Sequence, residues 1–341
     1  MKITLTPQNF LALCSLLLPV HSFQVLPTST RSQRGFPSFR QSSSLDMAAD
    51  MEGVYVMVNG MPGPMATAAA EACLRKGLKL SPFALTGPDM EQATITVVDD
   101  KTGSSANVLL VPSSTPDEIT AQLAGVREAM QDKDAALLAI DYTHPSAVNG
   151  NAKFYVANDI PFVMGTTGGD RAQLMTDVKG HSCVIAPNMG KQIVAMQAAL
   201  EDLATKYPAA FAGYSLAVTE SHQKTKADTS GTAKAVISSL KTLVGDECAF
   251  TNDDIDMVRD DDEAIAFGVP EDALTGHAFH TYTLSSADGS VQFQLQHNVA
   301  GRTIYAEGTA DAVQFLAKKL KTQTEPTVYN MINVLEEGAL E

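Results

Sequence analysis

Residues 54–66 read V-Y-V-M-V-N-G-M-P-G-P-M-A, and this stretch decides the fold. Its first five residues are apolar and rich in β-branched and aromatic types, which predicts a buried strand. A turn rich in glycine and proline follows. The alanine-rich segment 66–76 then predicts a helix that ends at Gly77. A strand, a tight glycine turn and a helix begin the βαβ unit that binds dinucleotides.

The turn of this unit has the features of a phosphate-binding loop. Gly60 permits the tight turn, Gly63 lets the backbone approach a pyrophosphate, and the helix N-terminus supplies N–H groups. Ala66 takes the third glycine position, which the pattern allows. Taken alone, the motif also fits a simple strand-to-helix turn. The residues expected to bind the cofactor here are Gly60, Met61, Pro62, Gly63, Pro64 and Met65.

The choice of cofactor depends on the end of the second strand, where an acid would accept bonds from the ribose hydroxyls of NAD. The expected position is Thr86-Gly87, and the first acid after it is Asp89. A 2′-phosphate would therefore meet no carboxylate, although no arginine is present to hold it. This favours NADPH and leaves NADH open.

The rest of the chain divides into two patterns. Up to about residue 188, strands alternate with helices, which predicts a parallel sheet with right-handed crossovers. After Gly190 a long helix to about Tyr207 is followed mostly by strands. The sequence thus predicts an α/β, Rossmann-like N-terminal domain with a parallel sheet and an α+β domain with a mixed, largely antiparallel sheet. The main segments expected are strands at 80–85, 135–140, 162–164, 183–186, 214–220, 279–284 and 291–296, one or two strands within 94–111, and helices 116–132, 144–157 and 233–244.

Charge and cysteine content limit the partners. The net charge of −15 argues against nucleic acid and anionic membranes. The four cysteines are far apart in sequence, so no disulfide framework and no metal site are expected. Any anionic substrate would therefore have to be drawn in by local positive charge and not by the net charge of the protein.

The N-terminus has the composition of a targeting sequence. Residues 10–20 form an apolar stretch too short to span a bilayer, and 23–45 are rich in Ser, Thr and Arg and contain no acid. This resembles the bipartite plastid presequence, a signal plus a transit peptide, of algae with secondary plastids. Plain secretion and a mitochondrial leader are the alternatives. We expect residues 1–50 to be removed and the mature chain to lie in the plastid (chloroplast) stroma, with no membrane segment.

Residues 220–233 read E-S-H-Q-K-T-K-A-D-T-S-G-T-A and concentrate the groups suited to chemistry. Small residues at a helix N-terminus suit a substrate carboxylate. His222 and Lys226 are candidate proton donors. A polar loop before a capped helix is the plain alternative. Elsewhere, His144 is expected to cap a helix or lie near the cofactor, His181 to lie in an exposed loop, and 260–263 to form a solvated turn, whereas His277, His280 and His297 are structural or near the substrate.

Five motifs occur in the order found in one enzyme family. They are V-N-G-M-P-G-P-M at 58–65, D-Y-T-H-P at 141–145, V-M-G-T-T-G at 163–168, A-P-N-M at 186–189 and segment 220–233. With the ending Y-N-M-I-N-V-L at 329–335, the chain resembles 4-hydroxy-tetrahydrodipicolinate reductase, the lysine-pathway reductase, in its plant form. Gln223 stands where bacterial members have a second histidine, and the proline that they carry before the serine is absent.

The resemblance implies roles for individual residues. Gly165, Thr166 and Thr167 would line the nicotinamide end of the cofactor, with Pro187, Asn188 and Met189 at a hinge between domains. His222 and Lys226 would be the acid residues, with Lys226, steadied by His222, giving the proton that completes hydride transfer from the nicotinamide to a cyclic imine dicarboxylate. Gln223, Gly231 and Thr232 would bind the substrate.

The resemblance also implies an organisation for the whole chain. Residues 1–50 would be the presequence, 51–188 the dinucleotide-binding domain and 189–302 the substrate and oligomerisation domain. Residues 303–341 would return to the first domain. A homo-oligomer, dimer or tetramer, is expected. The rival hypotheses are another two-domain Rossmann dehydrogenase and a non-catalytic dinucleotide-binding sensor.

Overall fold

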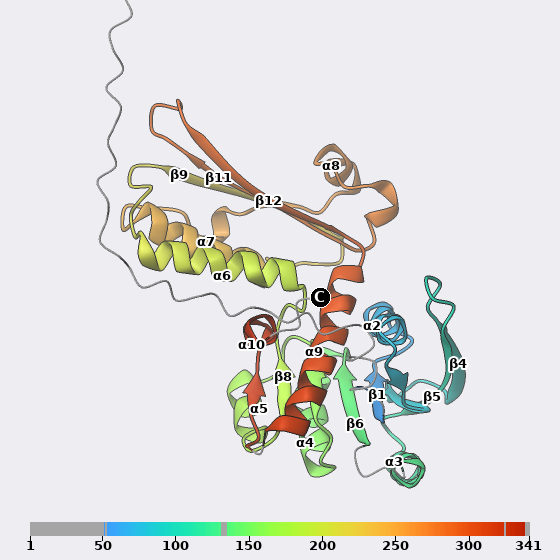
Figure 1. Ribbon diagram of the computed structural model, residues 1–341. Coiled ribbons are helices and arrows are strands. Elements are labelled where there is room, and N and C mark those ends of the chain that lie inside the picture. Colours follow the sequence, from blue (N-terminus) through green and yellow to red (C-terminus); the bar gives the residue numbers. More distant parts are fainter. Residues whose placement is uncertain (1–50, 52, 131–134, 324, 338–341) are drawn as a thin grey trace, which may run out of the picture. The chain divides into compact units, whose positions relative to one another are not determined.

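The computed structural model describes residues 51, 53–130, 135–323 and 325–337 (Figure 1). The expected presequence, 1–50, lies outside the described residues. All of the elements below belong to one compact unit.

A six-stranded sheet forms the first half of the fold. Its strand order is β13-β8-β7-β6-β1-β2, and every pairing in it is parallel. The predicted parallel sheet is therefore confirmed. Its elements are β1 (Val54–Asn59), α2 (Pro64–Arg75), β2 (Lys79–Leu80), α3 (Pro116–Ala129), β6 (Ala136–Asp141), α4 (Val148–Ala157), β7 (Phe162–Met164), α5 (Arg171–Asp177), β8 (Cys183–Ile185) and β13 (Val328–Tyr329).

The strand expected at 80–85 is in fact two strands that belong to different sheets. β2 pairs with β1, whereas β3 (Phe83–Thr86) pairs with β5 (Ser105–Pro112) in a three-stranded sheet that β4 (Ala93–Val98) completes. Pro82 lies between the two strands and has no N–H to continue the first ladder. The expected helix 144–157 likewise begins as a separate 3₁₀ turn, η1 (Pro145–Ala147), before α4.

A four-stranded mixed sheet forms the second half, as predicted. Its order is β10-β9-β11-β12; β9–β11 and β11–β12 are antiparallel and β10–β9 is parallel. Helices α6 and α7 lie along one face (Figure 1) and bury a core that includes Ile237, Leu240 and Tyr282. The bounds are α6 (Lys191–Lys206), β9 (Ser215–His222), α7 (Gly231–Val244), η2 (Asn252–Asp254), β10 (Asp256–Val258), α8 (Asp261–Ala266), η3 (Glu271–Ala273), β11 (His277–Ser285) and β12 (Gln292–Ala300).

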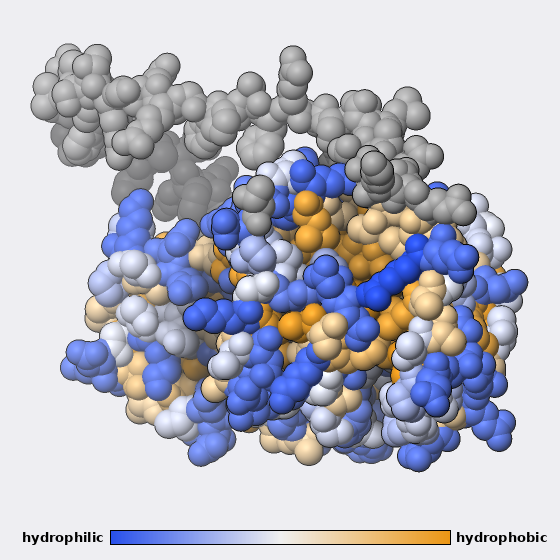
Figure 2. Space-filling view, turned by 90° about the horizontal axis from the view of Figure 1, so that it is seen from below, coloured by the Kyte–Doolittle hydropathy of each residue, from blue (hydrophilic) through white to orange (hydrophobic). Residues whose placement is uncertain are grey.

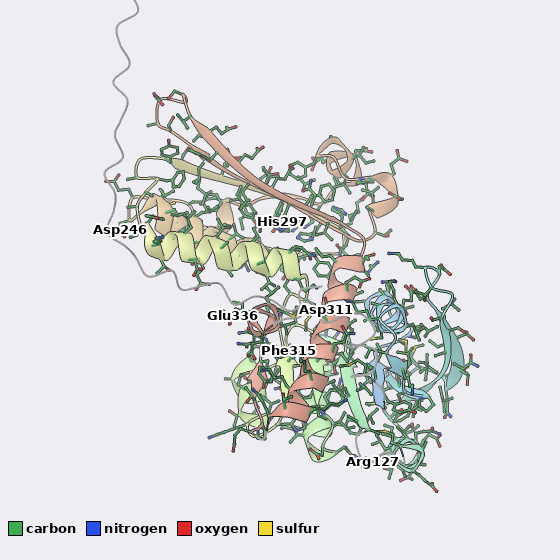
Figure 3. All side chains as sticks on the ribbon, in the orientation of Figure 1. Arg127, Asp246, His297, Asp311, Phe315 and Glu336 are labelled. Carbon is green, nitrogen blue, oxygen red and sulfur yellow. The ribbon has the colours of Figure 1, made fainter. Side chains whose placement is uncertain are left out.

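After β12 the chain returns to the first sheet. Helix α9 (Thr303–Thr322) packs on α2 and on β6, β7 and β8, and the short α10 (Met331–Glu336) follows β13. Asp311 and Phe315 both lie on α9 (Figure 3). Asp311 Oδ1 accepts a hydrogen bond from the Nζ of Lys76, the C-cap of α2, at 2.5 Å, and the Phe315 ring meets Tyr329 of β13 edge-on. This return completes both the edge of the sheet and its cover.

The surface is mainly polar on the face shown in Figure 2, where hydrophilic residues separate smaller apolar patches. Among the residues that the structure describes, no helix is both long and apolar enough to cross a bilayer.

Candidate active site

The loop after β1 is shaped by its own packing. Gly60 has φ 101°, and a Cβ there would lie 2.1 Å from the carbonyl oxygen of Tyr142. A Cβ on Gly63 would lie 2.7 Å from the Gly60 oxygen, which accepts the Gly63 N–H at 2.9 Å. Both glycines are therefore needed for the turn itself, before any ligand is considered.

The same loop fits a pyridine nucleotide. Gly63 is the N-cap of α2 and supplies no side-chain cap, so the first-turn N–H groups stay available for a phosphate. Met61 is buried, and its carbonyl accepts the Thr86 hydroxyl at 2.7 Å, so its side chain faces the core. Pro62 and Pro64 are exposed and Met65 is half-buried. These residues lie at the carboxyl end of a parallel strand, where open α/β sheets bind ligands.

Asp141, the last residue of β6, organises the neighbouring loops. Its buried carboxylate accepts from Thr166 Oγ1 at 2.6 Å, Tyr155 Oη at 2.7 Å and Asn151 Nδ2 at 2.9 Å. Its backbone oxygen also accepts from the N–H groups of Gly165 and Thr166. The Thr166 side chain is therefore turned inward. Of the predicted cofactor residues in this loop, Thr167 is exposed and Gly165 is half-buried.

Three of the plainer sequence interpretations can be compared with the structure. His144 Nδ1 accepts the Ser146 N–H at 3.2 Å and so caps η1. The expectation for His181 was wrong: it is buried, bonds the Ile160 oxygen at 2.9 Å and stacks on Phe162. The expected turn at 260–263 is instead the start of helix α8, which Asp260 caps.

Segment 220–233 runs from the end of β9 through a loop into α7. Ser230 is the N-cap of α7, and its hydroxyl accepts from Ala233 N at 3.4 Å. The Ser230 N–H donates to Glu220 Oε2 at 3.0 Å, and the Glu220 side chain is fully buried. The strand end and the helix start are thus joined through one carboxylate.

His222 is buried and neutral near pH 7. Its Nδ1 donates to the His277 carbonyl at 3.0 Å, so its Nε2 accepts from His280 Nε2 at 3.2 Å. Burial lowers the pKa of His222 to about 4 and the pKa of His280 to about 2. The prediction of His222 as a proton donor therefore meets a specific obstacle, because in this arrangement its free ring nitrogen is an acceptor.

Lys226 is held by a different partner from the one expected. Its Nζ donates to Asp228 Oδ1 at 2.5 Å, which lowers the pKa of Asp228. The Lys226 side chain is 24% exposed, which leaves the amine open to a ligand. The Lys226 N–H bonds the Gln223 oxygen at 2.9 Å, and Gln223 itself is half-buried.

The loop at 187–190 and the start of α7 touch directly. Asn188 Nδ2 donates to Thr232 Oγ1 at 2.9 Å, and Asn188 Oδ1 accepts from Gly190 N at 2.8 Å. Pro187 is exposed and Met189 is buried. Gly231, the first residue of α7, is exposed, with open space where a Cβ would lie. A predicted cofactor-side residue therefore meets a predicted substrate-side residue.

The candidate ligand atoms of Glu220, His222 and His280 lie within 4.8 Å of one another. A metal ion there would have to compete for Glu220 with the Ser230 N–H and with the guanidinium of Arg259, which forms an ion pair with that carboxylate. We assign no metal to this cluster.

Sequence reasoning missed Arg259 and Asp141. Arg259 directly precedes the acidic run at 260–263, and next to these charges it has the pattern of an exposed turn residue. The position of Asp141 at the end of a buried strand was visible in the sequence, but its partners were not. A signal for both would have been a charged residue at, or directly after, the last position of a strand.

Comparison with known proteins agrees with this geometry. The family described as "Dihydrodipicolinate reductase, N-terminus" matches residues 54–189, and its C-terminal counterpart matches 192–335. The "4-hydroxy-tetrahydrodipicolinate reductase 2, chloroplastic" of Arabidopsis thaliana is 45% identical over 289 residues, which are 84% of this chain and 78% of that protein. The "Probable 4-hydroxy-tetrahydrodipicolinate reductase 1, chloroplastic" of rice, Oryza sativa subsp. japonica, is 39% identical over 331 residues, which are 96% of this chain and 92% of that protein.

A solved structure shows the same fold. The dipicolinate-bound dihydrodipicolinate reductase from Paenisporosarcina sp. TG-14 aligns with a TM-score of 0.51 and 19% identity, covering 81% of this chain and 97% of that one. The match of the N-terminal family domain implies a pyridine nucleotide cofactor. The resemblance predicted from the motifs is thus confirmed, and the chain belongs to the 4-hydroxy-tetrahydrodipicolinate (dihydrodipicolinate) reductase family.

Proposed function

We propose that this chain reduces 4-hydroxy-tetrahydrodipicolinate to tetrahydrodipicolinate, a step of lysine biosynthesis by the diaminopimelate route. The substrate gains one hydride and one proton, and its 4-hydroxyl group leaves as water. The observation that carries the proposal is the contact between Asn188 and Thr232. It joins the end of the nucleotide-binding half to the helix start that suits a carboxylate. Family membership supports the reaction, and this contact supports where it takes place.

The cofactor occupies the carboxyl end of the first sheet in this proposal. A bound reduced nicotinamide supplies the hydride. The start of α2 with Gly60 to Met65 holds the pyrophosphate, and the loops at 165–167 and 187–189 hold the nicotinamide end. NADPH is favoured, because Thr86 at the end of β3 uses its hydroxyl on Met61 and the next acid, Asp89, is exposed. A 2′-phosphate would therefore meet no carboxylate from this strand end.

Lys226 supplies the proton and His222 supports it as a neutral group. The amine of Lys226 carries hydrogens and is open to a ligand, whereas His222 accepts a bond and has a pKa of about 4. Gly231 and Thr232 bind one carboxylate at the start of α7, where N–H groups and the helix dipole favour an anion. Gln223 is retained as a substrate-binding residue because it precedes Lys226 in the same turn.

A coupled assay tests the proposal. The substrate is generated enzymatically, and loss of NADPH or NADH absorbance is followed with wild type, Lys226→Ala and Lys224→Ala. Lys224 is a matched control, because it lies in the same loop but pairs with the exposed Asp261. Loss of a general acid lowers kcat about 10²- to 10⁴-fold. We expect that loss for Lys226→Ala alone and faster turnover of wild type with NADPH.

Two outcomes would contradict the proposal. Wild type that binds nucleotide without oxidising it would favour the sensor hypothesis. Equal activity of Lys226→Ala and wild type would remove the acid assignment.

The setting of the enzyme is also proposed. The plant relatives are named chloroplastic, which supports a plastid stroma location for this chain with residues 1–50 as the presequence. Import of a fusion of residues 1–50 to a fluorescent protein would test it. We also retain the predicted domain division at residues 188 and 302, and the homo-oligomer.

A further inference from the structure

Arg259 follows β10 and reaches back to the segment that carries Lys226. Its Nη2 pairs with the Glu220 carboxylate. Its remaining hydrogen bonds go to backbone carbonyls: Nε to Lys226 at 2.8 Å, Nη1 to Glu220 at 3.2 Å and to Val258 at 3.0 Å, and Nη2 to Asp228 at 3.3 Å. The arginine side chain is only 17% exposed.

These bonds use the geometry of a guanidinium. Five N–H donors in a fixed plane can satisfy one carboxylate and several carbonyls at once, whereas an ammonium is a point charge on a flexible stem. Two of the carbonyls belong to Lys226 and Asp228, which are also joined through their side chains. The residue that donates to Lys226 O therefore fixes the backbone from which the amine extends.

We propose that Arg259 is a positioning residue of the reduction, which holds the loop 223–229 so that the Lys226 amine points at the substrate. This inference rests on the proposed role of Lys226. Arg259 does not touch the reacting atoms in this proposal. It acts through Lys226 and through Glu220, whose other oxygen accepts from Ser230 at the N-cap of α7.

The same residue sets the charge balance around His222. The groups that face this imidazole are Glu220 from its own strand, His277 and His280 from β11, Lys226 from the loop, and Arg259; His297 of β12 lies behind His280. After burial, the carboxylate of Glu220 raises the pKa of His222, whereas Arg259 and Lys226 lower it. Without Arg259, an unneutralised carboxylate would remain beside two imidazoles.

The experiment compares variants of the full chain. Arg259→Lys keeps the charge and loses the planar fork, and Arg259→Gln loses both. Arg127→Lys is the matched control, because Arg127 also donates to a carbonyl, that of Asn158, but is exposed on α3 in the other half of the fold (Figure 3). The readouts are kcat and KM in the coupled assay, NADPH affinity by fluorescence, and the His222 pKa by NMR.

The positioning role predicts a distinct pattern. Misplacement of a reacting group by about 1 Å costs on the order of 10²-fold in rate, so Arg259→Lys should lower kcat about 10- to 100-fold while NADPH affinity is unchanged. The His222 pKa should stay near its wild-type value in Arg259→Lys and rise by about one unit or more in Arg259→Gln. Arg127→Lys should match wild type in every readout.

A double variant keeps the inference falsifiable if Arg259→Gln alone does not fold. Arg259→Gln/Glu220→Gln removes the buried charge pair, so the His222 pKa should return toward the wild-type value while kcat stays low, because the carbonyls of Lys226 and Asp228 have still lost their donor. Restored kcat in the double variant would overturn the inference. A kcat of Arg259→Lys within about twofold of wild type would also overturn the inference, because the loss of a positioning group should lower kcat by much more. Wild type that does not turn over would instead refute the proposed function.

Discussion

A single buried carboxylate at residue 141 holds several loop residues in place. Asp141 accepts hydrogen bonds from the side chains of Asn151, Tyr155 and Thr166, so its carboxylate is held by one amide and two hydroxyl donors. Two of these donors belong to α4 and the third to the loop after β7, so the carboxylate joins the two segments. The shape of the loop at 165–167, which we propose to line the nicotinamide, therefore depends on the buried carboxylate and backbone oxygen of Asp141.

Asp141→Asn should destabilise the fold and weaken nucleotide binding. The amide turns one acceptor into a donor that meets other donors, and an unsatisfied buried group costs about 1–3 kcal/mol. Urea unfolding and NADPH fluorescence titration would measure both effects. Asp202→Asn on the exposed side of α6 is the control and should change neither. If Asp141→Asn binds NADPH with wild-type affinity, nucleotide binding by the loop at 165–167 does not depend on the carboxylate.

At the level of single residues, the sequence predicts types better than partners. The turn glycines Gly60 and Gly63 could be identified because their backbone requirement is local. The contacts of Arg259 with Glu220 span 39 residues and those of Asp141 with Thr166 span 25, and no local pattern encodes them. His181 was misplaced for the same reason, since its partner Ile160 belongs to a different segment.

Three neighbouring strands of the second sheet, β9, β11 and β12, carry a row of imidazoles, of which His222 and His280 are buried and His297 is half-buried. His280 of β11 faces both Glu220 of β9 and His297 of β12 in register, and it stacks on His297 with ring centroids 4.5 Å apart. Burial is the first cause of a lowered pKa in all three of His222, His280 and His297, to about 4, 2 and 4. The folded sheet therefore binds fewer protons than the unfolded chain in mild acid.

This row should make stability fall in mild acid. The folded pKa values lie below the unfolded value of about 6.5, so stability is complete above pH 6.5 and declines as pH falls toward 4. Each such imidazole contributes up to about 1.4 kcal/mol per pH unit in that window. Urea unfolding at pH 7, 6 and 5 would measure the slope. His297→Gln should flatten it, whereas His144→Gln, at an exposed cap residue, should not; an unchanged slope in His297→Gln would contradict the assignment.

At the level of elements, hydrophobic patterns located most strands and helices but not their sheet partners. The apolar runs at 135–140, 162–164 and 183–186 correspond to β6, β7 and β8. The run at 80–85 looked continuous in the same way, yet Pro82 divides it between two sheets. A hydrophobic pattern indicates that residues are buried, but it does not distinguish burial in one sheet from burial in two adjacent sheets.

Across the whole molecule, the second sheet ends in an unprotected edge. β12 is the last strand in the order β10-β9-β11-β12, and its nine residues Q-F-Q-L-Q-H-N-V-A contain no charge and no proline. Natural edge strands usually carry charged residues or proline, which prevent pairing with another strand. The sequence of β12 therefore supports the proposed homo-oligomer, with a second copy of this chain as the partner.

Light scattering after size-exclusion chromatography would test this edge. We expect wild type to elute as a dimer or tetramer and Gln294→Lys/Gln296→Lys to shift toward monomer, because charges on an edge oppose pairing. Gln122→Lys on α3 is the matched control. A double variant with the wild-type mass would place the interface elsewhere.

At this scale the sequence predicted a parallel sheet followed by a mixed one, because strand and helix order is local information. The three-stranded sheet of β3, β5 and β4 was not predicted, since its central strand pairs with a segment on the far side of β4 in the chain. Pairing order depends on how the layers pack, and that involves residues across the whole chain.

The return of α9 and β13 to the first sheet affects the order in which the two halves are completed. The sheet edge beside β8 and the face under α9 are closed by roughly the last forty residues, although most of the sheet lies much earlier in the chain. A chain that enters a plastid with its N-terminus first, as proposed above, receives the intervening second half before the segment that closes the first half. The half that arrives first is therefore completed last, and its open edge and uncovered face are exposed in the meantime.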